Sequence, residues 1–187
     1  MTKIFIIHGS YGNPDENWFP WLKQELEALG HTVFVPKFST PENQSLEKWM
    51  KEFEYYQHLI DEDTIFVGHS LAPAFILSIL EKLETPKPIK ACFFVSGFLG
   101  LLGDPKFDEI NKTFTAKDFN WEKIKKNCKE FHNYHSDNDP YIPLKVAKEF
   151  AQKLGVDINL IKGAGHFNES TGYTKFDILL ENILKVL

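Results

Sequence analysis

The feature that most constrains the fold is an alternation of strand-like and helix-like segments along the whole chain. Runs rich in β-branched and aromatic residues predict six strands, over residues 3–9, 31–36, 64–69, 89–97, 131–136 and 157–163. Apolar residues at helical spacing predict helices over residues 18–30, 45–59, 71–84, 144–155 and 173–187. Such alternation favours right-handed crossovers between parallel strands, with helices on both faces of the sheet. We therefore predict an α/β protein, a three-layer α/β/α sandwich around a six-stranded parallel sheet.

The length of the chain and its uniform composition predict one domain. With 187 residues, the chain can build one domain with a substantial core and is short for two. No repeat, low-complexity segment or linker divides it, so we expect residues 1–187 to form a single domain. The one irregular stretch, residues 97–130, is too long for a plain connection. It either borders a pocket or packs a short helix on the core, and its role as lid or scaffold stays open.

Composition and charge restrict the partners that we expect. Hydrophobic residues make up 43% of the chain and charged residues 25%, as in ordinary folded proteins. The net charge is −5 and no cluster of Lys and Arg stands out, which argues against nucleic acids and membranes as partners. The oligomeric state stays open between a monomer and a weak dimer.

The cysteines and the N-terminus indicate a location inside the cell. Cys92 and Cys128 are the only cysteines, which gives neither a disulfide framework nor the spacing of a metal site. The apolar run after Lys3 is too short for a signal peptide, and no apolar run long enough to span a membrane follows. We expect a reduced, cytoplasmic protein that needs no metal ion and no organic cofactor.

The segment "TIFVGHSLAPA", residues 64–74, places a serine where a predicted strand turns directly into a predicted helix. A serine at this point is either an ordinary helix N-cap or a nucleophile on a sharp turn, the pattern G-x-S-x-G. The turn requires small residues two positions before and after the serine. Gly68 meets this requirement, and Ala72 adds only one methyl group. Ser70 is therefore a candidate nucleophile, and Pro73 stands in the first helical turn, where its missing N–H is not needed.

A serine nucleophile needs a base and a carboxylate that orients the base, and two later loops supply them in the expected order. Asp139 follows the fifth predicted strand, in "HSDNDPYIP", and His166 follows the sixth, in "KGAGHFN". Taken singly, Asp139 could cap an Asx-turn and His166 could be an ordinary loop histidine. Asp137 is the rival carboxylate. Because each residue comes just after a strand, we predict a catalytic triad of Ser70, Asp139 and His166.

The loop after the first strand, "HGSYG", is the expected source of a second amide for an oxyanion hole. We assign the two backbone donors to Leu71 and Ser10. Tyr11, Trp18 and Phe98 are candidate walls of the substrate pocket, although Trp18 and Phe98 fit core positions equally well.

With these motifs, the sequence resembles the small serine hydrolases of the retinoblastoma-binding protein 9 family and their bacterial esterase-like relatives. The resemblance covers essentially the whole chain and rests on "IIHGSYGNPDENWFPWL", "VGHSLAPA", "FFVSGF", "HSDNDPYIP" and "GAGHFN". It implies a minimal α/β-hydrolase fold without a large cap domain, and a triad at Ser70, Asp139 and His166. Ala72 departs from the glycine that many hydrolases carry at this position.

The expected function is that of a serine hydrolase, a carboxylesterase that cleaves small or short-acyl esters through an acyl-enzyme. Thioesterase or amidase chemistry would use the same triad. An alternative of another class is a protein-binding module that keeps a vestigial triad.

Overall fold

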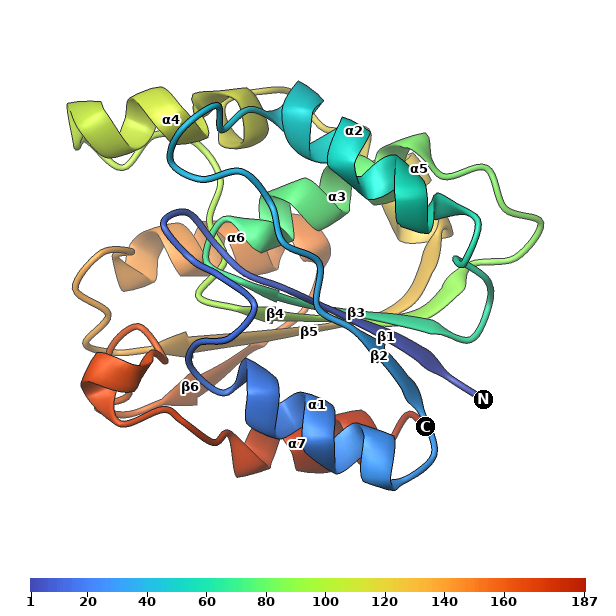
Figure 1. Cartoon of the computed structure of the whole chain (residues 1–187). Coiled ribbons are helices and arrows are strands. Elements are labelled where there is room, and N and C mark those ends of the chain that lie inside the picture. Colours follow the sequence, from blue (N-terminus) through green and yellow to red (C-terminus); the bar gives the residue numbers. More distant parts are fainter.

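The computed structural model of the chain describes residues 1–187 and contains one six-stranded sheet (Figure 1). The strand order is β2-β1-β3-β4-β5-β6, and every neighbouring pair is parallel. The strands are β1 (Lys3–Ile7), β2 (Thr32–Phe34), β3 (Thr64–His69), β4 (Ile89–Val95), β5 (Cys128–Ser136) and β6 (Ile158–Ile161). The predicted six-stranded parallel sheet is confirmed.

Seven helices cover the two faces of the sheet, which gives the predicted three layers (Figure 1). One face carries α1 (Phe19–Ala28) and α7 (Asp177–Leu184). The other carries α2 (Leu46–Gln57), α3 (Ala72–Lys82), α4 (Pro105–Thr115), α5 (Trp121–Lys126) and α6 (Leu144–Leu154). None of these helices is both long and apolar enough to cross a membrane.

The alternation of side chains along each strand divides the core into two halves. On β1, Ile4 and Ile6 pack toward α1 and α7, whereas Phe5 and Ile7 pack toward α3. Both halves are apolar because a parallel sheet is covered on both faces. Helix α3 is buried from Ala72 to Leu80, since other helices cover the side that faces away from the sheet.

The irregular stretch after β4 forms helices packed on the core. Asp104 caps α4 by accepting hydrogen bonds from the amides of Lys106 and Phe107, and Asn120 caps α5 by accepting from the amide of Lys123. Apolar side chains of this stretch pack against the same half of the core as α3. The stretch therefore does both things that the sequence left open: its helices pack on the core, and Leu102 and Phe107 also line a cavity.

Element boundaries differ from the prediction mainly near the C-terminus. Strand β5 begins at Cys128, three residues before the predicted start, and α7 begins at Asp177 instead of residue 173. Before α7 the chain forms a short 3-10 turn (Glu169–Thr171), and Phe176 is buried in the core. An aromatic residue in a buried loop contributes the same apolar signal as one in a helix, so the apolar pattern alone extended the helix too far.

The sheet changes winding direction between β1 and β3, and this places the candidate site. Strand β2 lies on one side of β1 and β3 lies on the other. The helices that follow β1 and β3, α1 and α3, pack on opposite faces of the sheet (Figure 1). The loops that follow β1 and β3 therefore lead to opposite faces of the sheet. They begin at the carboxyl ends of these neighbouring strands, where open α/β sheets form their binding sites.

Candidate active site

Ser70 stands on a sharp turn between β3 and α3 with a backbone φ of 62°. Such a left-handed conformation is uncommon for a residue with a side chain and is often found at functional sites. A Cβ atom on Gly68 would lie 2.6 Å from Cδ1 of Ile76 and 3.1 Å from the nitrogen of Pro73. A side chain would be crowded there, which agrees with the small residue that the pattern requires.

Ser70 is not the N-cap of α3, which was the alternative explanation for a serine in this position. The N-cap residue is Leu71, and no side chain caps the helix. The amide of Ser70 instead continues the sheet by donating to the carbonyl of Val95, over 2.9 Å. The hydroxyl of Ser70 makes no hydrogen bond to the protein and is left free for other chemistry.

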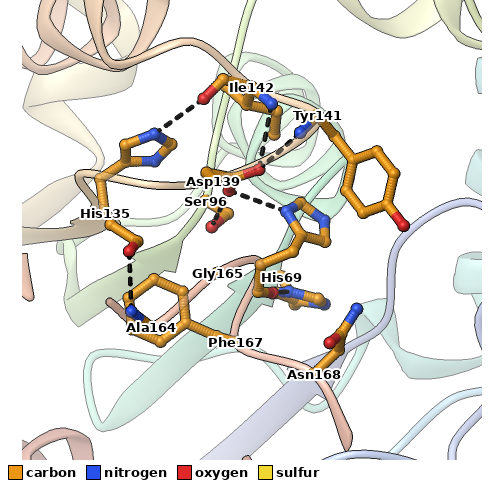
Figure 2. A network of polar contacts seen from close by, with 12 residues as sticks. His69, Ser96, His135, Asp139, Tyr141, Ile142, Ala164, Gly165, Phe167 and Asn168 are labelled. Atoms are coloured by element: carbon orange, nitrogen blue, oxygen red, sulfur yellow. Dashed lines mark hydrogen bonds and ion pairs between the residues drawn. The ribbon is translucent and has the colours of Figure 1, made fainter. Parts of the chain in front are cut away.

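Asp139 and His166 lie in direct contact. Nδ1 of His166 donates to Oδ2 of Asp139 over 2.8 Å, and the Asp139 side chain has no exposed surface. The other carboxylate oxygen accepts hydrogen bonds from the amides of Tyr141 and Ile142, each over 3.0 Å (Figure 2). Burial alone would raise the pKa of Asp139, but the hydrogen bonds from His166 and from these amides outweigh burial, so its pKa is lowered. The carboxyl group therefore stays ionised beside the imidazole.

The rival carboxylate, Asp137, makes a different contact. It is exposed, and its Oδ1 accepts a hydrogen bond from the amide of Gly163 over 2.8 Å. The neighbouring Ser136 and Asn138 accept from the amides of Ala164 and Gly165. Three consecutive side chains, from the last residue of β5 and the two that follow it, thus fix the loop after β6, which carries His166.

His69 also holds the loop after β6 that carries His166, a role that the sequence pattern did not reveal. Its Nε2 donates to the carbonyl oxygen of His166 over 2.8 Å, and its ring packs edge-on against Trp18 and Phe19. Burial, together with the nearby His166, lowers the pKa of His69 to about 3. His69 therefore stays neutral, with the proton on Nε2 that this hydrogen bond requires.

The loop after β1 approaches Ser70 closely enough to supply a backbone donor. A Cβ atom on Gly9 would lie 2.7 Å from Cβ of Ser70 and 3.2 Å from its Oγ. The amides of Ser10 and Leu71 donate to no acceptor in the protein. His8, buried behind this loop, donates from Nδ1 to the carbonyl of Gly9 and accepts at Nε2 from the amide of Phe38. His8 thus shapes the loop from the core side.

A partly buried polar cluster joins the β1 loop to α4. The hydroxyl of Ser10 donates to Oδ1 of Asn111 over 2.5 Å, and Nε2 of Gln44 donates to both residues. Asn111 is only 1% exposed, although it lies in the stretch that the sequence left unassigned. This cluster could not be predicted because Ser10 and Asn111 are 101 residues apart in the chain.

A cavity of about 650 Å³ brings the candidate residues together. Ser70, His166, Ser10 and Tyr11 line it. Further lining comes from residues on α4 and on the loops before it and after β5, namely Leu102, Asp104, Lys106, Phe107, Pro140 and Tyr141. A second cavity of about 620 Å³, between α5 and α6, contains none of the candidate residues.

Two of the expected pocket walls do not reach this cavity, and this corrects the expectation. Trp18 and Phe98 have no exposed surface and belong to the two halves of the core. Trp18 supports His69, and Phe98 packs behind Phe107, so each lies one layer behind the lining. In the sequence, an aromatic residue that lines a cavity cannot be distinguished from one that packs in the core behind the lining.

Comparisons with known proteins identify the family of the chain. The profile of the serine hydrolase family matches residues 4–185. The protein YdeN of Bacillus subtilis (strain 168) is 33% identical over 97% of this chain and 94% of its own length. Serine hydrolase RBBP9 of Rattus norvegicus is 28% identical over 100% of this chain and 96% of its own.

Solved structures of similar proteins share the fold of this chain. The crystal structure of the ydeN gene product from Bacillus subtilis covers 100% of this chain and 98% of its own, with a TM-score of 0.93 and 30% identity. A YdeN-like hydrolase from Pectobacterium atrosepticum, 16% identical, shares the fold with a TM-score of 0.72 over 99% of this chain and 90% of its own. By sequence and by fold, the chain belongs to the serine hydrolase family of α/β-hydrolases.

Proposed function

We propose that this serine hydrolase is a carboxylesterase that cleaves small or short-acyl esters through Ser70, His166 and Asp139. The observation that carries the proposal is that Ser70 shares one cavity with a histidine already bound to a buried carboxylate. Nucleophile, base and orienting acid are the three parts that serine catalysis requires.

The protonation states follow from the contacts. An ionised carboxylate only accepts hydrogen bonds, so Nδ1 of His166 carries the proton and Nε2 keeps a free lone pair. Nε2 takes the proton from Ser70 as its Oγ attacks the ester carbonyl, and Asp139 stabilises the imidazolium that forms. The free hydroxyl of Ser70 fits this role, because hydrogen bonds to the base often form only once substrate is bound.

The oxyanion of the tetrahedral intermediate is held by the amides of Ser10 and Leu71. Both amides lack an acceptor in the protein, and that of Leu71 lies at the N-terminal end of α3, where the helix dipole favours negative charge. His166 then protonates the leaving alcohol, and a water molecule attacks the acyl-enzyme by the same route.

The preference for small substrates rests on the shape of the site. The cavity of about 650 Å³ is lined by residues of the loops after β1, β3, β5 and β6, and by the segment that carries α4. Such a volume accommodates a small ligand. For the location, we propose the cytoplasm, because both cysteines are free thiols buried in the core.

A substrate panel tests this function. The panel contains p-nitrophenyl esters of increasing acyl length, matched acyl-thioesters and amino-acid amides, with Ser70→Ala as the control. We expect the highest kcat/KM for esters with two to four acyl carbons, and no activity above background for Ser70→Ala. Activity that rises beyond about eight acyl carbons would contradict the size preference, and faster cleavage of thioesters or amides would contradict the ester assignment.

A further inference from the structure

Ser96, just after β4, adopts an uncommon backbone conformation. Its φ is 50°, in the left-handed region, and the residue is completely buried. Its amide donates to the carbonyl of Tyr134 on β5 over 3.0 Å, which keeps the turn attached to the sheet. A glycine would adopt this conformation without strain, so the serine side chain is present despite a conformational cost.

The side chain of Ser96 has one strong contact. Its hydroxyl donates to Oδ2 of Asp139 over 2.8 Å, the same oxygen that accepts from Nδ1 of His166 (Figure 2). The other oxygen of Asp139 is bound by the amides of Tyr141 and Ile142. The carboxylate therefore has two donors on each oxygen.

The four donors differ in how they restrain the acid. Tyr141 and Ile142 follow Asp139 within three residues, so they belong to the same loop and move with it. Ser96 stands 43 residues away at the end of β4, in the middle of the sheet. It is the only one of the four that ties the carboxylate to the central sheet.

The backbone of the turn that carries Ser96 is closely packed against neighbouring helices. A Cβ atom on the next residue, Gly97, would lie 2.6 Å from the ring of Phe150 and 3.0 Å from Cβ of Pro73. The backbone is thus packed between α3 and α6, and the direction of the Ser96 hydroxyl is fixed by its surroundings.

We propose that Ser96 is a positioning residue, which fixes Oδ2 of Asp139 so that the carboxylate faces Nδ1 of His166. Without the Ser96 hydroxyl, the carboxylate can pivot about the oxygen that the loop amides hold, and the hydrogen bond to His166 loses its direction. The effect on catalysis rests on the proposed function, whereas the effect on the Asp139–His166 hydrogen bond does not.

Two substitutions separate this role from a purely structural one. Ser96→Gly removes the hydroxyl and also relieves the backbone strain, whereas Ser96→Ala removes the hydroxyl and keeps the strain. We expect Ser96→Gly to have the higher Tm of the two. We expect kcat to fall about tenfold in both, with KM changed less than twofold, since a hydrogen bond to a charged group is lost in each. The matched control is Ser78→Ala, which removes another fully buried serine hydroxyl, one that donates to Ala74 within α3.

The closing experiment measures these kinetics together with the proton NMR resonance of the His166 Nδ1–H on the full-length protein. We expect the resonance to shift or broaden in both Ser96 variants and to stay in place in Ser78→Ala. An unchanged resonance would overturn the proposal. So would a fall in kcat that is confined to the Ser96 variant with the lower Tm, because both variants lack the hydroxyl. If the wild type has no Ser70-dependent activity, the proposed function fails, and the resonance alone then decides the role of Ser96.

Discussion

Gly9 and Ser70 lie so close together that a methyl group on Gly9 would approach Cβ of Ser70 to 2.7 Å. The two residues follow neighbouring strands, β1 and β3, at the point where the sheet changes winding direction. This close approach brings the free amide of Ser10 to the side of the candidate nucleophile. The absence of a side chain at residue 9 is therefore a requirement of the site and not of the core.

The first prediction concerns this contact. Gly9→Ala forces the β1 loop away from Ser70, and we expect kcat/KM to fall by about 10²–10³-fold, as for the loss of an oxyanion donor. Steady-state kinetics on a short-chain p-nitrophenyl ester measure the effect. Gly30→Ala is the contrast, because Gly30 has φ 86° and no neighbour within 4 Å. It should lower Tm and leave kcat/KM unchanged, and a similar loss of activity in both variants would argue against a special role for Gly9.

The second prediction distinguishes the two carboxylates after β5. Asp139→Asn replaces the charge beside His166 with an amide that favours the wrong imidazole tautomer, so we expect kcat to fall by about 10⁴-fold. Asp137→Asn keeps an oxygen that can accept from the amide of Gly163, and it should retain nearly full activity. The same assay measures both variants. Equal losses would mean that the contact between Asp139 and His166 is not catalytic.

The third prediction is a pH dependence of stability due to His69. Its pKa is about 3 in the folded protein and close to 6.5 in the unfolded chain. Between these values the unfolded chain binds a proton at His69 and the folded protein does not, so stability falls as the pH falls. The expected contribution is about 1.4 kcal/mol per pH unit. Urea unfolding of the wild type and of His69→Gln from pH 7 to 4 should show a shallower slope for the variant, and identical slopes would contradict this account.

The fourth prediction tests whether the contact between α4 and the β1 loop supports catalysis. Asn111→Leu leaves the hydroxyl of Ser10 and the amide of Gln44 without their buried acceptor, and we expect a loss of about 1–3 kcal/mol in stability. The β1 loop is also released, so kcat should fall about tenfold. Lys112→Ala, on the exposed side of the same helix, should change neither quantity. Full activity of Asn111→Leu would mean that the contact between Asn111 and Ser10 does not hold the β1 loop for catalysis.

The sequence predicted best what depends on local pattern. Strand and helix order follow from the spacing of apolar residues, and the predicted start of the second helix at residue 45 agrees with Ser45, which caps α2 by accepting from the amide of Lys48. The steric pattern around Ser70 was equally informative, because the requirement for a small residue at Gly68 is local. Such features need no knowledge of which distant segments meet.

What the sequence could not predict depends on long-range contacts. Ser96 stood in a quoted motif without a role, since nothing near it in the chain points to Asp139. The G-x-S-x-G pattern gives His69 no role, because its hydrogen bond to the His166 carbonyl joins residues 97 positions apart in the chain. Trp18 and Phe98 were expected in the pocket, yet whether an aromatic side chain reaches a cavity or stops one layer short depends on the packing of other elements.

The most direct test of the central claim is covalent labelling with a fluorophosphonate probe, followed by peptide mass mapping. The account predicts that the wild-type protein takes up one probe molecule on Ser70, that Ser70→Ala takes up none, and that His166→Ala labels at least 10²-fold more slowly because the base is lost. No labelling of the wild type, or unchanged labelling of Ser70→Ala, would contradict the assignment of Ser70 as the nucleophile.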